Sequence, residues 1–250
     1  MDSSPLRWQL TSLPIPFMSE SSITRPVCTI NAVLFRIITR QLQVALVRRP
    51  ANAAVYANTL ALPGGAIDPH SDQTLNDTLL RHLKSKTGIT PSYTAKLEFE
   101  GNLARDPQGW SISCPYLCFT DEHALALTDV HWFAVTDFLH DAPPVSLPFD
   151  HQMVIQKAFQ RLYNRARYST EPNFFFRQPF TLSELQTVYE VILGKPLHKK
   201  NFRDRIDESV SVMETGESKI VKRSRAKLYT HTNPYKPHFF SRVLQGAFDY

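Results

Sequence analysis

The sequence is poor in cysteine, in long apolar runs and in export signals. Its three cysteines, Cys28, Cys114 and Cys118, are an odd number and cannot all pair. A metal site at Cys114 and Cys118 would need two more ligands, so we expect these two to be buried free thiols. No apolar window approaches the roughly 20 residues that cross a bilayer. Residues 1–27 carry two separated arginines and no apolar run of signal-peptide length. We therefore expect a cytoplasmic protein that does not enter a membrane.

The charged residues are unevenly distributed along the chain. The 250 residues are 42% hydrophobic and 20% charged, which is typical of a globular chain with one large or two modest domains, and we favour two. Lys195 to Lys227 contains ten basic and five acidic residues, whereas the remainder has 18 of each. The whole excess of +5 therefore lies in one C-terminal module. This pattern is typical of a polyanion-binding surface, with a solvated charged face as the alternative.

Hydrophobic periodicity predicts alternating strands and helices in the first two thirds of the chain, as in an α/β fold. A tight reversal near Arg40 and Gln41 separates the first two strands. Ser71 or Asp72 is expected to cap the first helix, and Gly88 to end it. The predicted elements are two strands within 27–50, a strand at 60–65, a helix at 72–87, strands at 96–103, 110–120 and 130–135, and a helix from residue 150.

The stretch LPGGAIDPHSDQTLNDTLLRHLKSKTGI, residues 62–89, resembles the Nudix box, a loop and helix that hold divalent cations against a diphosphate. Its loop is two residues longer than usual, and five residues keep the frame: Gly65, Arg81, Leu83, Gly88 and Ile89. His82 replaces the first helix glutamate, and Ser85 and Lys86 replace the two metal-binding glutamates. These three positions share one helix face, so that face lacks the carboxylates that Mg²⁺ needs. We therefore expect no catalytic residue, no metal and no hydrolysis.

Two other interpretations of this domain stay open. An active Nudix hydrolase would need replacement acids, and the nearest candidates are Asp68, Asp72, Asp77, Glu98 and Glu100. A decayed domain could instead serve as a platform for dimerisation or protein interaction. Such a platform would bind neither a nucleotide nor DNA.

Several features favour retained binding of a nucleotide diphosphate. Glycine at 64 and 65 allows close approach and positive φ, and the following helix N-terminus offers N–H groups to phosphate. RDPQGW (105–110) and FDH (149–151) resemble segments of ADP-ribose-handling Nudix proteins, and arginine suits a diphosphate. A surface role for any one arginine, and a helix N-terminal role for the histidine, are the alternatives. The candidate ligand-binding residues are Arg48, Arg49, Gly64, Gly65, Arg105, Asp106 and His151.

The basic module predicts a helix-turn-helix followed by a hairpin, or wing. Thr181 and Glu184 form a capping box, and Gly194 ends this helix. Phe202 and Ile206 face inward on a second, shorter helix, and residues 210–232 form a strand, a loop with the tip KRSRAK, and a returning strand. A small α+β cap with a charged surface is the alternative. The candidate DNA-binding residues are Lys199, Lys200, Asn201, Arg203, Arg205, Lys222, Arg223, Arg225 and Lys227.

The order of these motifs, and above all FTLSELQTVYEVILG with the later NFR, resembles the NrtR family of Nudix-related transcriptional regulators over residues 27–232. The resemblance implies an α/β Nudix-like sandwich, a mixed sheet flanked by helices, followed by a winged helix-turn-helix domain. It also implies a homodimer, a palindromic operator in double-stranded DNA near genes of NAD metabolism, no cofactor, and ADP-ribose as the effector. The expected boundaries are an N-terminal extension 1–26, a Nudix-like domain 27–149, a linker helix 150–170, a winged-helix domain 171–232 and a C-terminal tail 233–250.

The expected mechanism is linkage between a ligand site and a DNA site. Twofold symmetry would place two recognition helices about one DNA turn apart, roughly 34–36 Å. An effector that prefers a different angle between the domains lowers DNA affinity by its differential affinity for the two arrangements, typically about 1–3 kcal/mol.

Overall fold

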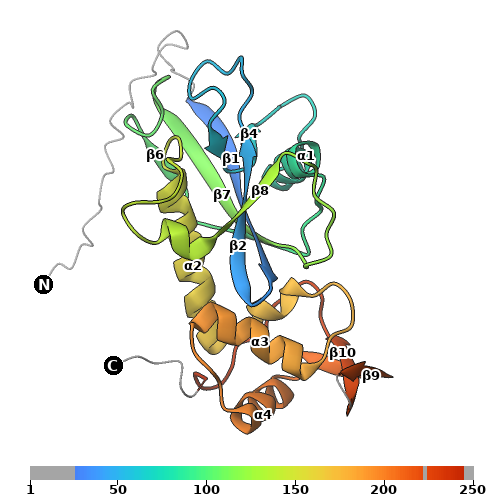
Figure 1. Cartoon of the computed structure of the whole chain (residues 1–250). Coiled ribbons are helices and arrows are strands. Elements are labelled where there is room, and N and C mark those ends of the chain that lie inside the picture. Colours follow the sequence, from blue (N-terminus) through green and yellow to red (C-terminus); the bar gives the residue numbers. More distant parts are fainter. Residues whose placement is uncertain (1–25, 222–223, 245–250) are drawn as a thin grey trace, which may run out of the picture.

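A mixed β-sheet forms the N-terminal part of the computed structural model, which describes residues 26–221 and 224–244 (Figure 1). The strands that it contains are β1 (Val27–Ile38), β2 (Gln41–Arg48), β3 (Leu60–Ala61), β4 (Gly64–Ala66), β5 (Tyr93–Lys96), β6 (Glu100–Asn102), β7 (Ser111–Phe119) and β8 (Val130–Ala134). The central order is β3-β2-β1-β7-β5, with β4 on β1, β6 on β7 and β8 on β2. Because β1 and β7 run parallel while the other described pairs are antiparallel, the sheet is mixed, as predicted.

Two helices cover opposite faces of this sheet: α1 (Leu75–Thr87) and α2 (His151–Tyr168). Side chains of β1 alternate between them, as a period of two requires. Leu34 packs in one cluster with Leu83 of α1, and its neighbour Phe35 packs in another with Ile155 of α2. Figure 1 shows the sheet between the two helices, so this part has the predicted sandwich of a sheet flanked by helices.

Helix α1 begins three residues later than predicted. Thr74 is the N-cap, since its hydroxyl accepts from the Asp77 amide and the Asp77 carboxylate accepts from the Thr74 amide. Asp72, one of the two predicted caps, is unavailable because its carboxylate binds Arg81. Gly88 ends the helix at φ 72°, as predicted.

The predicted strand at 96–103 is in fact split between β5 and β6. Lys96 pairs with Tyr116 and Glu100 pairs with Ser113, so four residue steps on this side oppose three on β7. The extra residue interrupts the pairing, as in a β-bulge. The reversal between the first two strands lies at Thr39 and Arg40, within one residue of its prediction.

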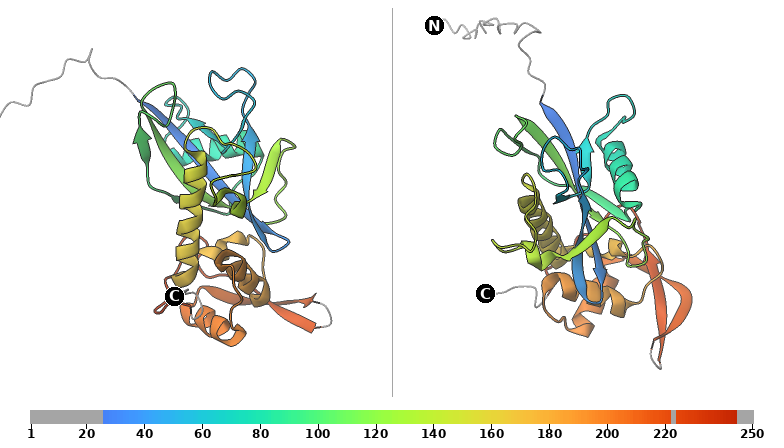
Figure 2. Two further views of the ribbon diagram at one scale, coloured as in Figure 1. Left: turned by 60° about the vertical axis from the view of Figure 1, so that its left-hand side comes forward. Right: turned by 45° about the horizontal axis from the view of Figure 1, so that its top comes forward.

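The C-terminal part is a winged helix. Its elements are α3 (Leu182–Leu193), α4 (Lys199–Ser209), β9 (Val212–Val221) and β10 (Ser224–His231). The capping box of Thr181 and Glu184 is present, and Gly194 ends α3 at φ 68°, so both predictions are confirmed. Phe202 and Ile206 are buried, and β9 and β10 form the predicted hairpin, which projects away from the helices in Figure 2.

The two parts share one hydrophobic core. The cluster that holds β1 and α2 continues through the short helix η3 (Glu171–Phe175) to α3 and α4. Phe175 stacks on Phe119 of β7 with ring centroids 4.2 Å apart, and Phe174 stacks on Tyr93 of β5 at 4.8 Å. A second short helix, η2 (Val135–Phe138), connects β8 toward α2. The junction is therefore packed like a core, so a displacement of the sheet can be transmitted through these contacts to the winged helix.

The three cysteines are free thiols, and Cys114 and Cys118 are buried, as predicted. Both belong to the cluster beneath α1, and burial raises the pKa of each thiol. Within the described part of the chain, no set of three histidine, cysteine, aspartate or glutamate side chains could hold a metal ion. No helix in residues 26–221 or 224–244 is both long enough and apolar enough to cross a membrane.

Candidate ligand site and nucleic-acid interface

A cavity of about 580 Å³ lies where β1 begins and β2 ends, bounded also by β4, the last turns of α1 and the start of α2. Small-ligand sites typically measure about 300–1,000 Å³. All the residues predicted to bind a ligand line it: Arg48, Arg49, Gly64, Gly65, Arg105, Asp106 and His151. The fold thus brings four separate segments of the chain to one cavity, although the contacts of these residues with a ligand stay a prediction.

The two glycines are required by packing and do not adopt the predicted positive φ. In β4 they pair with Asn31 and Ile30 of β1. A Cβ atom at Gly64 would lie 2.1 Å from the carbonyl oxygen of Ile30, and one at Gly65 would lie 2.5 Å from Cε1 of His82. The backbone of β1 therefore excludes a side chain at Gly64, whereas a side chain at Gly65 would require the His82 ring to move.

Helix α1 meets the cavity through its C-terminal half, not through its N-terminus as predicted. Ser85 and Lys86 line the cavity, whereas the first turn is capped by Thr74 outside it. His82 Nε2 lies 3.0 Å from the carbonyl oxygen of Ala66, and the ammonium of Lys86 donates to the carbonyl oxygen of Gly64. The helix face that carries glutamates in the Nudix box therefore holds β4 with a histidine and a lysine.

The five candidate replacement acids do not line the cavity. Asp72 accepts from Arg81 Nε at 2.7 Å and Nη2 at 2.5 Å, and this guanidinium holds the pKa of Asp72 well below its usual range. Asp77 caps α1, and Glu100 pairs with Lys157. The acids that do line the cavity are Asp106 and Asp129, and neither belongs to a cluster of three possible metal ligands in the described residues.

Arg105 lines the cavity, but each of the three nitrogens of its guanidinium has a partner within the protein. Nε and Nη2 donate to the two carboxylate oxygens of Asp150 at 2.9 and 3.0 Å, and Nη1 donates to Ser111 Oγ at 2.7 Å. Both side chains of this ion pair are at least 90% buried. The pair fastens the RDPQGW turn to the N-terminus of α2, so Arg105 shapes the wall and has little charge left for a ligand. Asp106 likewise accepts from the Gln108 amide within the turn.

His151 is a buried link between α2 and the strand that precedes the Gly-Gly pair. Its Nδ1 accepts from the Leu62 amide at 3.1 Å, and although His151 is the first residue of α2, its side chain makes no capping hydrogen bond. Burial lowers the pKa of His151 to about 3, against an opposing effect of Asp150. The imidazole is therefore neutral at pH 7, with its proton on Nε2, and Nε2–H is a donor available to a ligand in the cavity.

Positive charge dominates the cavity wall once Arg105 is neutralised by Asp150. Arg48 donates to the Asn58 carbonyl at 2.7 Å, and Arg49 donates to the Val55 carbonyl at 3.0 Å. The guanidinium of Arg49 also lies over the Phe149 ring, 5.0 Å from its centroid, and its Nε is buried without an acceptor among the described residues. Carbonyl partners leave the charge of these arginines uncompensated, so the cavity suits an anion.

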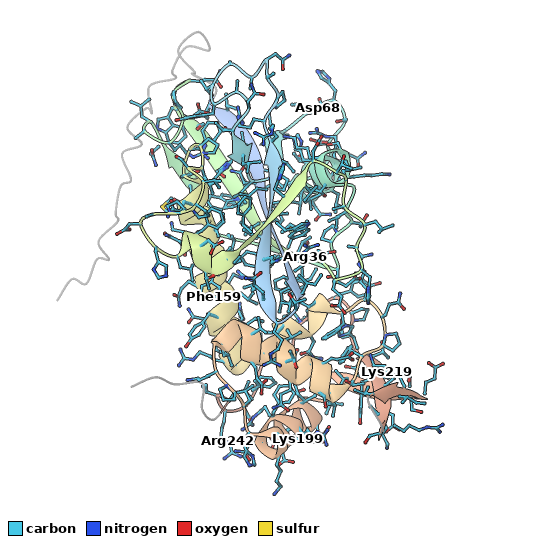
Figure 3. The ribbon with its side chains drawn as sticks, viewed as in Figure 1. Arg36, Asp68, Phe159, Lys199, Lys219 and Arg242 are labelled. Atoms are coloured by element: carbon cyan, nitrogen blue, oxygen red, sulfur yellow. The ribbon has the colours of Figure 1, made fainter. Side chains whose placement is uncertain are left out.

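A second basic surface lies on the first turn of α4. Lys199, Lys200 and Asn201 are exposed there, and Arg203 is half-buried, while Phe202 faces the core. Figure 3 places Lys199 at the end of the molecule farthest from the sheet. A helix N-terminus with adjacent lysines attracts phosphate, which is the arrangement of a recognition helix that enters a DNA groove.

Two predicted DNA-binding residues have partners inside the protein. Arg205 donates to Glu208 at 2.7 Å and to Ser241 at 3.3 Å, and its side chain is only 12% exposed. Lys227 pairs with Glu214 across the hairpin at 2.9 Å, and both Lys227 and Arg225 on this strand are exposed. Two further candidates, Lys222 and Arg223, lie outside the described residues.

The C-terminal segment 233–244 adds a basic residue that the sequence patterns missed. Its backbone is held at the end of α2, since the Phe240 amide donates to the Tyr168 carbonyl and the Leu244 amide to the Arg167 carbonyl. The contact of Ser241 with Arg205 brings it beside α4, and the adjacent Arg242 is exposed at the same end of the molecule as Lys199 (Figure 3). The apolar residues Phe239, Phe240, Val243 and Leu244 were the sequence signal that this tail packs, and the last three belong to the core or pack against it.

The tip of the β1–β2 hairpin contacts the winged helix directly. Arg40 lies 3.2 Å from the Glu190 carboxylate of α3 and 3.4 Å from the Thr187 hydroxyl. The same carboxylate accepts from the Leu197 amide at 3.1 Å, in the turn before α4. A smaller cavity of about 220 Å³ lies beside this contact. Strand β2 thus connects the ligand cavity at Arg48 with the helix-turn-helix at its opposite end.

Comparison with known proteins gives consistent matches. Residues 174–230 match the model of the NrtR DNA-binding winged helix domain. The chain is 36% identical over 248 residues to the ADPR responsive transcriptional repressor NtrR of Acinetobacter baylyi, which covers 94% of this chain and 97% of that one. Among solved structures, it is similar to Shewanella oneidensis NrtR complexed with a 27mer DNA, with a TM-score of 0.78, 37% identity, and coverage of 87% of this chain and 99% of that chain. The NUDIX domain of the same Shewanella protein complexed with ADP ribose matches with a TM-score of 0.51 and 33% identity over 58% of this chain and 94% of that chain.

Proposed function

The chain belongs to the NrtR family, and from this premise we propose that it is a dimeric transcriptional repressor whose Nudix-like domain binds ADP-ribose or a related nucleotide diphosphate. The observation that carries the proposal is that two separate basic sites lie in one molecule whose two parts share a hydrophobic core. One is the cation-rich cavity without a carboxylate cluster, and the other is the basic first turn of α4. The regulated genes are those of NAD metabolism, as the family resemblance implies.

On the DNA side, Asn201 and Arg203 are the base-reading residues of α4. Arginine and asparagine form paired hydrogen bonds with base edges in the major groove. Lys199, Lys200 and the hairpin residue Arg225 hold phosphates, which supplies affinity without sequence information. Arg205 serves the fold through Glu208 and Ser241, so we remove it from the set of base contacts. The roles of Lys222, Arg223 and Lys227 are retained as phosphate contacts.

On the ligand side, Arg48, Arg49 and Lys86 face the diphosphate, and His151 donates a hydrogen bond from Nε2. Arg105 and Asp106 shape the wall, and Gly64 and Gly65 keep β4 close to α1. Hydrolysis by a Nudix mechanism needs a bound cation to activate water. The acids in the cavity lining are Asp106 and Asp129, and these two do not form a group of three possible metal ligands with any other described residue. The domain is therefore a sensor and not an enzyme.

Coupling between the sites runs along β2. A ligand that draws Arg48 and Arg49 toward its phosphates displaces one end of this strand, and Arg40 at the other end holds Glu190. Glu190 also fixes the turn before α4, so a shift of the hairpin tip changes the angle of the recognition helix. In a homodimer, such a shift alters the spacing of two recognition helices, which lowers affinity for a palindromic operator.

The test is fluorescence anisotropy of the full chain on a labelled duplex from the region upstream of its own gene and on a scrambled duplex, at one salt concentration, with and without ADP-ribose. We expect tight binding to the first duplex and release by ADP-ribose. Equal weak binding to both duplexes contradicts the repressor function. Sequence-preferring binding that ADP-ribose does not change contradicts the proposed effector alone.

A further inference from the structure

We propose that the ammonium group of Lys86 takes the place of the divalent cation in this Nudix-like cavity, so that the ligand diphosphate is neutralised by the protein and bound without metal. The inference rests on the proposed function, because it presupposes that a nucleotide diphosphate occupies the cavity. It assigns to Lys86 a positive role in recognition, beyond the loss of a metal-binding carboxylate.

The position of the ammonium is set by both helix and strand. Lys86 lies one turn after His82 on the same face of α1, and both side chains contact backbone carbonyls of β4. Strand β4 is fixed in turn by its pairing with β1, which lies so close that a Cβ atom at Gly64 would be 2.1 Å from the Ile30 carbonyl oxygen. The ammonium is therefore placed at the cavity wall by rigid elements, as a bound ion would be.

The charge of Lys86 has no carboxylate partner among the described residues. Its pKa is lowered by burial, and further by the nearby cations Arg49 and Arg81. The Gly64 carbonyl uses one of the three N–H donors of the ammonium. A partly buried cation without a counter-ion is costly, and an anionic ligand would supply the missing charge.

Arg49 independently indicates that the cavity lacks an anionic partner for its cations. Its Nε is buried without an acceptor among the described residues, and its guanidinium lies against the Phe149 ring on the cavity wall. A diphosphate between Lys86 and Arg49 would give both cations their missing acceptors. A divalent cation in the same space would meet these two positive charges and no carboxylate cluster.

The experiment is isothermal titration of the full chain with ADP-ribose, once in excess EDTA and once in millimolar Mg²⁺. We expect the two dissociation constants to agree within about twofold. Lys86→Gln, which removes the charge and keeps a polar side chain, should weaken binding roughly 10- to 100-fold, since a hydrogen bond between charged groups is lost. Lys86→Arg should restore most of the affinity because it returns the charge.

Lys84→Gln is the matched control, since Lys84 is exposed on the same helix, and thermal melting verifies that each variant is folded. Binding by the unmodified chain that requires Mg²⁺, or full affinity in a folded Lys86→Gln variant, overturns the inference and leaves the sensor function standing. Failure of the unmodified chain to bind ADP-ribose under both conditions instead refutes the ligand assignment of the proposed function, and the inference with it.

Discussion

Arg40 and Glu190 form an ion pair of 3.2 Å between residues 150 positions apart, and it joins the tip of the β1–β2 hairpin to helix α3. Arg40 is 63% exposed, whereas Glu190 is 15% exposed and already holds the turn before α4. The pair therefore contributes little to stability, about 0–1 kcal/mol, yet it lies on a connection between the ligand cavity and the recognition helix.

Substitution of Arg40 by alanine should uncouple ligand binding from DNA binding. We expect the melting temperature and the DNA affinity without ligand to change little, while the factor by which ADP-ribose weakens DNA binding falls severalfold, because the hairpin tip no longer holds Glu190. Anisotropy titrations with and without ADP-ribose measure this factor. Lys157→Ala, which breaks another exposed ion pair with Glu100, is the control and should leave the factor unchanged. An unaltered factor in Arg40→Ala would place the coupling elsewhere.

Substitution of Arg203 by alanine should relax sequence discrimination. A paired contact of arginine with a base contributes about 1–3 kcal/mol of discrimination, so operator affinity should fall roughly 5- to 150-fold while affinity for a scrambled duplex falls much less. Competition titrations with single-base operator variants would locate the base concerned. Arg205→Lys is the comparison. Because Arg205 is paired with Glu208, this substitution should lower thermal stability more than it lowers base discrimination. An equal loss on both duplexes would reassign Arg203 to phosphate.

Substitution of Arg242 by alanine should weaken DNA binding without regard to sequence. The C-terminal segment lies beside α4 through Ser241, and Arg242 has no ion pair or hydrogen bond among the described residues. Removal of one phosphate contact should lower the slope of log affinity against log salt by about 1 for both operator and scrambled duplexes. Lys236→Ala, in the same segment, provides the control. Identical slopes for the variant and the unmodified chain would show that the tail does not reach DNA.

Acid should destabilise the protein through His151. Burial lowers its pKa to about 3 from an ordinary value of about 6.5, so the unfolded chain binds a proton that the folded chain excludes. Stability from this group is complete above pH 6.5 and is lost as the pH falls toward 3, by about 1.4 kcal/mol per pH unit. Urea unfolding between pH 7.5 and 4.5 measures the loss. His82 and His231, whose pKa values burial also lowers, add to it.

The variant His151→Gln isolates the contribution of this residue, since glutamine can still accept from the Leu62 amide but does not titrate. We expect the variant to be less stable at pH 7.5 and to lose stability more slowly below pH 6.5. Parallel pH profiles for the two proteins would mean that another group controls acid unfolding.

Features that depend on neighbours in the sequence were predicted correctly. The capping box of Thr181 and Glu184, the ends of helices at Gly88 and Gly194, and the inward face of α4 all follow from hydrogen bonds or periodicity within about four residues. The α/β class also follows from the pattern of strands and helices, whereas the mixed sheet with a helix on each face was implied by the resemblance to the NrtR family. These features rest on local geometry, which the order of residues specifies directly.

Features that depend on distant partners were decided by the tertiary structure. The sequence predicted Asp72 as a helix cap, but its carboxylate binds Arg81. It predicted Arg105 as a phosphate contact, but Asp150, 45 positions later, neutralises its charge. A charged side chain forms its strongest hydrogen bonds with an oppositely charged group nearby, and the fold determines which groups are nearby. The sequence by itself determined that positions 82, 85 and 86 carry no carboxylate and that the excess charge is C-terminal. Only the packing of α1 on β4 decided that Lys86 faces the cavity, because backbone carbonyls become its neighbours once the sheet has formed.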